Sequence, residues 1–226
     1  AAIWACDVLD LNQSFKLTFQ ANFDNINTGD GIAFVLQSEG VPTVLGGQGG
    51  GIGYSVGNQT GCLGGDCIID PSVVVEFDIW DNSADFWDMS NPGLGNINDI
   101  SCDHVSIQRG GVQLSSNALV PPACLLPGGT NVTNGLTYDV CIAWDVATLE
   151  YKVYFDSNLV ANYNGDIRTN FPNPSSVFWG YTAASGGGAT NLQVCNVAMQ
   201  TNSPSPSCLC VPPVATATPS SLSICS

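Results

Sequence analysis

The sequence is poor in positive charge. Its 226 residues include four Lys and Arg against nineteen Asp and Glu, a formal net charge of −15. This charge would repel a phosphate backbone, so nucleic acid is excluded as a partner, and it disfavours binding to a bare anionic membrane. Two interpretations of the acidity remain open: plain solubility in a salty medium, and the binding of hard cations that prefer carboxylate oxygens.

Long apolar runs, helical periodicity and the motifs of nucleophilic catalysis are also missing. No apolar run approaches the roughly 18 residues that a membrane span needs, so no membrane insertion is expected. No segment of ten or more residues has a helical period. The chain has one His, no Gly-x-Ser-x-Gly motif and no Gly-Lys-Ser/Thr motif, which argues against serine hydrolases and phosphate-loop enzymes.

Cysteine, by contrast, is abundant. Ten cysteines are too many for a reduced compartment without a metal motif. The close pairs Cys62/Cys67 and Cys208/Cys210 do not form two CxxC knuckles, and the single His is far from both in sequence. We therefore expect disulfides and an extracellular or cell-surface location. The sequence leaves their connectivity open, although Cys62 and Cys67 are near enough to clip one loop.

Short β-rich segments separated by Gly, Asn, Asp and Pro clusters dominate the chain. Residues 15–23 alternate between apolar and polar, the period of a half-buried strand, whereas 31–37 and 72–80 are continuous apolar runs typical of a sandwich interior. Residues 1–6 also resemble the middle of a sheet. Further strands are expected at 103–108, 137–144, 150–155, 177–183 and 192–199. The pattern predicts an all-β sandwich or jelly roll.

The composition changes near residue 201. Residues 201–207 and 211–221 are rich in Pro, Ser and Thr, as in a linker. The final Ser223-Ile-Cys-Ser226 resembles the start of the repeated Ig-like modules of large bacterial surface adhesins. We expect a folded domain over 1–200, a linker and the start of a following module over 201–226, and a larger multi-domain parent chain.

Two carboxylates stand out on one expected strand. Glu76 and Asp78 are two residues apart, so their side chains share one face. Adjacent carboxylates on an apolar strand repel each other and cost desolvation, which a bound cation would offset. The opposite face of the same strand carries Val75, Phe77 and Ile79.

Further candidate ligands follow in the sequence: Asn82, Asp99 and His104, the single histidine. Carboxylates, an amide oxygen and an imidazole together suit two adjacent ions, calcium on the oxygens and a manganese-like ion on the imidazole. Taken singly, a Glu-x-Asp pair is usually a solvated strand face and a lone His an ordinary polar residue. Their combined spacing favours a metal site.

These residues carry a family resemblance. The segment from Val74 to Asn82, followed by Asp99 and then His104-Val-Ser-Ile107, resembles the metal-binding strand and loop of L-type (legume-type) lectins. In that family the pattern is Glu-x-Asp-x-aromatic-x-Asn, then an Asp five residues before a His. The resemblance implies a concanavalin-like jelly-roll sandwich of antiparallel sheets that binds Ca²⁺ and a second divalent ion such as Mn²⁺. The implied metal ligands are Glu76, Asp78, Trp80 through its carbonyl, Asn82, Asp99 and His104.

Other segments agree in order with this family. Residues 29–35 and 46–54 are similar to its first two sugar loops, 138–156 to its back-sheet hairpin, and 180–188 to the strand entering its fourth loop. The resemblance covers about residues 1–199 and is nearest to bacterial members with long surface architectures. One departure is the loop after Asn82, which is longer than in plant members. It contains Asp85 and Asp88, which are alternatives to Asp99 as a ligand.

The resemblance also implies a sugar site. Asp30 would accept hydrogen bonds from two sugar hydroxyls, Asn82 and the Gly50 N–H would donate to them, and Trp80 would cover the apolar face of the ring. Gly187 or Gly188 would line the edge that distinguishes one sugar from another. The peptide before Asp30 is expected to be cis in the calcium-loaded state. The alternatives are ordinary tight turns for the glycines and core packing for Trp80.

We therefore predict a calcium-dependent, glycan-binding lectin module that is secreted or at the cell surface, serves adhesion and is not an enzyme. One rival is a laminarinase-type glycoside hydrolase, whose Glu-x-Asp-x-x-Glu pattern would fall on Glu76, Asp78 and Asp81. The third position is here one methylene too short for the carboxylate spacing of a retaining mechanism. The other rival is a structural adhesin spacer with an inactive sugar site.

Overall fold

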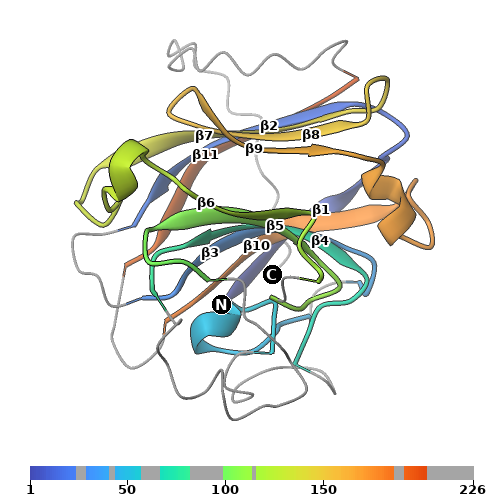
Figure 1. Ribbon diagram of the computed structural model, residues 1–226. Helices are drawn as coiled ribbons and strands as arrows, with labels where there is room; N and C mark the ends of the chain where they lie inside the picture. The colour runs from blue at the N-terminus through green and yellow to red at the C-terminus, as the bar shows by residue number, and fades with distance from the viewer. Residues whose placement is uncertain are drawn as a thin grey trace.

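Two antiparallel sheets packed face to face make up the protein (Figure 1). The computed structural model describes residues 1–23, 29–40, 44–56, 67–81, 99–113, 116–185 and 191–202. The six-stranded sheet has the order β1-β10-β3-β4-β5-β6, and the five-stranded sheet the order β11-β2-β7-β8-β9. The arrangement confirms the predicted all-β sandwich.

Strands make up nearly all of the regular structure described. They are β1 (Ala2–Leu9), β2 (Phe15–Asn22), β3 (Gly31–Gln37), β4 (Ser72–Asp78), β5 (His104–Arg109), β6 (Val120–Cys124), β7 (Thr137–Asp145), β8 (Glu150–Phe155), β9 (Asn158–Asn164), β10 (Val177–Ala184) and β11 (Gln193–Thr201). The helices are 3-10 turns, η1 (Gly49–Gly51), η2 (Pro127–Gly129) and η3 (Ile167–Asn170). No helix within the described ranges has the length and apolar character needed to cross a membrane.

Two strands were not predicted, and both lie at sheet edges. β6 contains Pro121 and Pro122, which lack the N–H donors of a central strand but are tolerated at an edge. β9 is rich in Asn, a residue that is depleted in strands. Both sequences therefore resemble loops, and neighbouring strands hold them in place.

The main core lies between the sheets. Val75, Phe77 and Ile79 all point into it, as predicted from their alternation with Glu76 and Asp78 along β4. Phe77 packs between two rings of the opposite sheet, with centroids 6.2 Å away at Phe19 and 6.4 Å away at Phe155. The face of β4 that carries the two carboxylates therefore points away from the five-stranded sheet.

A second, smaller core covers that other face. The segment that carries η1 crosses the outer side of the six-stranded sheet (Figure 1). Its Ile52 and Tyr54, both fully buried, pack with Trp4, Ile69 and Val74. Every residue of β4 is consequently buried, which explains why its sequence is a continuous apolar run interrupted only by the two carboxylates.

Strands from the beginning and end of the described domain pair in both sheets. In the six-stranded sheet β1 pairs with β10, with Ala2 opposite Thr182. In the five-stranded sheet β2 pairs with β11, with Phe15 opposite Thr201. One edge strand of each sheet, β1 or β11, is therefore held by a partner far away in the sequence.

The cysteines form disulfides, as expected. Cys102 is bonded to Cys124, across the start of β5 and the end of β6. Three more cysteines are in disulfides, and one, Cys195 of β11, is a free and exposed thiol. The further disulfide-bonded residues are Cys6, Cys67 and Cys141. Cys62, Cys208, Cys210 and Cys225 lie outside the described residues, so the suggested Cys62–Cys67 pairing stays a prediction.

Candidate metal and sugar site

The register of the central strands assembles the acidic cluster. β4 pairs with β5 so that Asp78 stands opposite His104 and Glu76 opposite Ser106. Directly opposed residues of antiparallel strands have neighbouring side chains on the same face. Side-chain ligand atoms of Glu76, Asp78 and His104 lie within 4.8 Å of one another, and all three residues are buried. The two carboxylates are thus not a solvated strand face.

Three neutral donors hold the Glu76 carboxylate. Ser106 Oγ donates to Oε1 at 2.8 Å, and Gln113 Nε2 donates to Oε2 at 2.8 Å. The Tyr54 hydroxyl also donates to Oε2. Gln108 extends the network by donating to Ser106 Oγ at 3.0 Å. These donors fix the carboxylate in place before any ligand binds.

His104 is oriented with one ring nitrogen toward the carboxylates. Nδ1 lies 3.1 Å from the carbonyl oxygen of Cys102, which identifies it as the protonated nitrogen. Nε2 then carries the lone pair; it is buried, has no hydrogen-bond partner among the described residues, and lies 3.9 Å from Glu76 Oε1. A histidine that donates through one nitrogen and offers the other to a carboxylate-lined space has the arrangement of a metal ligand.

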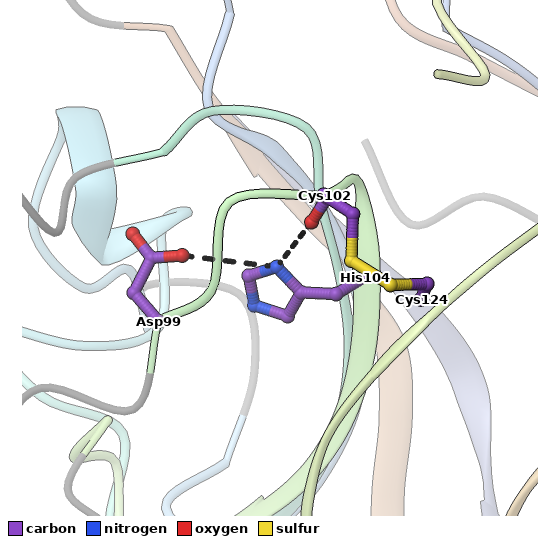
Figure 2. Close-up of a disulfide and its surroundings, with 4 residues drawn as sticks. All are labelled: Asp99, Cys102, His104 and Cys124. Atoms are coloured by element: carbon purple, nitrogen blue, oxygen red, sulfur yellow. Dashed lines mark hydrogen bonds and ion pairs between the residues drawn. A yellow bond between two sulfur atoms is a disulfide. The ribbon is translucent and has the colours of Figure 1, made fainter. Parts of the chain in front are cut away.

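Asp99 lies beside the same imidazole, on its Nδ1 side (Figure 2). Its Oδ1 is 3.7 Å from His104 Nδ1, and its side chain is 4% exposed. The structure thus places Asp99 next to the cluster, although its carboxylate faces the nitrogen opposite the one that faces Glu76.

The site is strongly unfavourable for unbalanced negative charge. Burial, followed by the nearby carboxylates of Glu76, Asp99 and Asp30, raises the pKa of Asp78 well above its ordinary value. The Trp80 backbone N–H, which donates to Asp78 Oδ1 at 2.9 Å, opposes this shift only in part. Burial and the neighbouring Glu76 likewise raise the pKa of Tyr54, so its hydroxyl remains a donor.

No lysine or arginine offsets this charge. Arg109 is at the far end of β5, five residues from His104 or roughly 16 Å along the strand. Lys152 and Arg168 form ion pairs with Glu150 and Asp166 at 2.7 Å each, and the remaining cation, Lys16, lies on β2 in the other sheet. A divalent cation is the chemical species that fits a buried set of carboxylates and one imidazole.

Asp30 reaches the same end of the sheet from the loop before β3. Its N–H donates to Ala184 O at 3.3 Å, and its carbonyl accepts from Ile79 N–H at 2.9 Å. The side chain is 4% exposed. The next residue, Gly31, packs so closely on β4 that a Cβ would lie 2.3 Å from the Phe77 carbonyl oxygen. These contacts place the Asp30 carboxylate near that of Asp78.

The peptide before Asp30 is expected to be cis when calcium is bound. The cis bond within the described residues is Asp70–Pro71, and Gly29–Asp30 is not cis in this structure. The cis form expected for the calcium-loaded state stays a prediction.

Two other predicted sugar-site residues lie within the described part of the chain. Gly50 is part of η1, in the loop that also supplies Tyr54. Trp80 follows β4 and is 38% exposed. Trp80 is therefore not a core residue, and simple core packing is wrong for it. The glycines at 46 and 47 do serve tight packing, since a Cβ at Gly47 would lie 2.0 Å from the Val56 carbonyl oxygen.

Several predicted residues fall outside the described part: Asn82, Asp85, Asp88, Gly187 and Gly188. Conversely, sequence reasoning missed Tyr54, Ser106 and Gln113, the donors to Glu76. Ser106 was detectable in principle, because its register opposite Glu76 follows from pairing β4 with β5. Tyr54 and Gln113 come from loops, whose path the sequence does not specify.

Comparison with known proteins adds a family and a fold. The family model described as "Legume lectin domain" matches residues 4–208. Lectin II from Ulex europaeus shares the fold with a TM-score of 0.59 at 19% identity, over 89% of this chain and 79% of that one. The winged bean acidic lectin in complex with methyl-α-D-galactose has a TM-score of 0.57 at 20% identity, over 87% and 75%. A Bauhinia forficata lectin in complex with GalNAc has a TM-score of 0.57 at 18% identity, over 87% and 76%.

Proposed function

The chain belongs to the legume lectin domain family, and we propose that it binds neutral sugars in a calcium-dependent manner at the end of the six-stranded sheet. Legume lectins are non-enzymatic carbohydrate-binding proteins that also bind metal ions. The family therefore confirms the predicted sandwich of the legume-lectin type and the predicted non-enzymatic class. It also removes the laminarinase-type hydrolase from consideration.

One observation carries the proposal: ligand atoms of Glu76, Asp78 and His104 converge within 4.8 Å, buried and without a basic side chain to balance them. In our proposal Asp78 and Asp99 bind calcium together with Asn82 and the Trp80 carbonyl. Hard oxygen ligands of this kind are those that calcium prefers. Glu76 and His104 Nε2 would hold a second ion such as Mn²⁺, which accepts imidazole.

The proposed sugar site is next to this metal centre. Asp30 is the charged acceptor, because hydrogen bonds to a carboxylate are stronger than neutral ones and compete better with water. The Gly50 N–H and Asn82 donate to the same hydroxyls, and the exposed indole of Trp80 covers the apolar face of the ring. Gly187 and Gly188 line the remaining edge. The metal fixes the loops that supply these groups.

Galactose and GalNAc are the first sugars to test. Two structural neighbours are in complex with methyl-α-D-galactose and with GalNAc. Their identity to this chain is near 20%, so the sugar is not transferred from them. They define the first probes, and mannose and glucose types are the matched alternatives.

We further propose that the module acts outside the cell, in adhesion to glycans. At least five cysteines are in disulfides, which persist in oxidising compartments. The Pro- and Ser-rich residues 201–226 would link the domain to a following module in a bacterial surface protein. The alternative hypothesis, a structural adhesin spacer with an inactive sugar site, differs from this proposal only in predicting no sugar binding. A binding experiment therefore decides between the two hypotheses.

A glycan array with the calcium-loaded protein, repeated with chelator, tests the proposal. We expect calcium-dependent binding to a set of related glycans and no release of reducing sugar from β-glucans. A folded, calcium-loaded protein that binds no glycan would favour the spacer. Binding that survives chelation would contradict the role of the metal.

A further inference from the structure

We infer that the Cys102–Cys124 disulfide positions the metal centre: it holds the Cys102 carbonyl against His104 and so keeps the Nε2 lone pair directed at Glu76. The inference rests on the proposed metal site but concerns a different group. Figure 2 shows the arrangement, with the carbonyl of Cys102 and the carboxylate of Asp99 both at Nδ1 of the imidazole.

The bridge connects the two residues that flank the histidine in space. Cys102 is two residues before His104 in the chain, and Cys124 is the direct cross-strand partner of His104. Asp103, the residue between Cys102 and His104 in the chain, is also held by hydrogen bonds. Its carbonyl accepts from Leu125 N–H at 2.9 Å, and its Oδ2 accepts from Val132 N–H at 2.7 Å. The bend that presents the Cys102 carbonyl is thus held by the disulfide to the end of β6 and by hydrogen bonds to Leu125 and Val132 in the segment that follows β6.

β6 has few backbone hydrogen bonds to hold it against β5, so a covalent link to that strand matters for its position. It is an edge strand, its second and third residues are prolines without N–H donors, and its register with β5 is irregular between Val105 and Ile107. Few ladder hydrogen bonds can therefore hold it. The Cys102–Cys124 disulfide takes the place of the missing hydrogen bonds, and it lies at the end of β6 that is next to His104.

The position of the Cys102 carbonyl decides which nitrogen of His104 is protonated. With the carbonyl 3.1 Å from Nδ1, that nitrogen donates and Nε2 stays bare. If the carbonyl withdrew, Nδ1 would keep only the more distant Asp99 Oδ1, at 3.7 Å, as an acceptor. The tautomer that carries its proton on Nε2, 3.9 Å from Glu76 Oε1, would then gain population. A protonated nitrogen cannot bind a metal, so the ring would first have to exchange its proton.

The single histidine of the chain makes this measurable. In metal-free protein labelled with ¹⁵N-histidine, the ring gives one pair of nitrogen signals that report its tautomer. In the neutral ring of the parent, we expect the proton on Nδ1, next to the Cys102 carbonyl, and a bare Nε2. The double variant Cys102→Ser/Cys124→Ser should show a mixture of the two tautomers. The matched control is Cys195→Ser, which removes a free, exposed thiol and should leave the signals unchanged.

Titration with Mn²⁺ alone gives the second readout. Loss of a group that orients a metal ligand typically weakens metal affinity about 10–100-fold, so we expect a decrease of that size in the double variant and none in Cys195→Ser. If the serine pair does not fold, Cys102→Ala/Cys124→Val, which replaces the bridge by an apolar contact, takes its place.

Two results would overturn the inference. One is a parent protein whose Nε2 carries the proton, which needs no variant to detect. The other is a folded double variant with the parental tautomer and Mn²⁺ affinity within about twofold of the parent, well below the 10–100-fold loss expected. A parent that binds no Mn²⁺ would contradict the second ion of the proposed metal centre instead, and the tautomer comparison, made without metal, would still decide whether the disulfide holds the ring.

Discussion

Carboxylates on the two sheets have different partners. On the five-stranded sheet, Glu150 of β8 lies near the surface and pairs with Lys152 at 2.7 Å. At the end of the six-stranded sheet, Glu76 and Asp78 are buried, accept hydrogen bonds from neutral donors among the described residues, and lie near two further carboxylates. The negative charge of Glu150 is balanced by a lysine of the same strand, whereas the buried carboxylates of β4 have no lysine or arginine beside them. The contrast distinguishes a structural ion pair from a candidate metal site.

The largest effect should come from removing a carboxylate of the site. Calcium at 100 times its Kd would stabilise the parent by about 2.7 kcal/mol, or about 5–10 °C in Tm for a domain of this size. Asp78→Asn should abolish that shift, because the ligand is lost. Calorimetry with and without calcium measures it, and Glu150→Gln is the control that should keep the full shift. If calcium raised the Tm of Asp78→Asn as much as that of the parent, Asp78 would not be a calcium ligand, and the carboxylates of the two sheets would not differ in this respect.

Asp30→Asn should weaken sugar binding about ten- to hundredfold with little change in Tm. The variant keeps the shape of the side chain but loses a charge-assisted acceptor, worth roughly 1.5–3 kcal/mol. Titration calorimetry with the best glycan from the array measures the affinity. Asp139→Asn, on β7 of the other sheet, should bind like the parent. Equal binding by Asp30→Asn and the parent would mean that the sugar site has been misplaced.

Trp80→Ala should reduce sugar affinity by about tenfold, or about 1.4 kcal/mol, since the ring face loses its aromatic partner. Trp80 is 38% exposed, so folding should be little affected. Leu159 of β9 is 51% exposed and offers the matched truncation on the five-stranded sheet. If Leu159→Ala lowered sugar affinity as much as Trp80→Ala, the loss would reflect general damage and not a contact with sugar.

Tyr54→Phe should have the smallest effect, a metal affinity lowered about two- to tenfold. It removes one of three donors to Glu76, and a net hydrogen bond contributes about 0.5–1.5 kcal/mol. The comparison is Tyr151→Phe, because the Tyr151 hydroxyl is buried without a hydrogen-bond partner among the described residues. Its removal should leave stability unchanged or increase it. Metal titration and thermal melting of both variants provide the test.

Much of the fold was predictable because single strands carry their own signal. Alternation marks residues 15–22, and the period of two places Glu76 and Asp78 on the face opposite Phe77 without any knowledge of the fold. The edge strands escaped prediction because β6 and β9 are defined by the neighbours they pair with and not by their own composition.

The site was predictable only in its local part. The spacing of Glu76, Asp78 and His104 points to a metal, and the register then brings them together. Two of the three donors that hold Glu76, Tyr54 and Gln113, come from loops 22 and 37 residues away, and such long-range contacts leave no local pattern. The Cys102–Cys124 pairing is of the same kind, since ten cysteines permit many connectivities.

The pairing of early strands with late ones has a consequence for biosynthesis. β1 finds its partner only when β10 exists, and one edge of β2 waits for β11, more than 170 residues later. During synthesis from the N-terminus, β1 and the outer edge of β2 must remain unpaired until nearly the whole domain has been made. Folding is then expected to be slow and to begin late, as in other proteins dominated by non-local strand pairing. In that interval exposed apolar strands are prone to aggregate, and the net charge of −15 opposes their association.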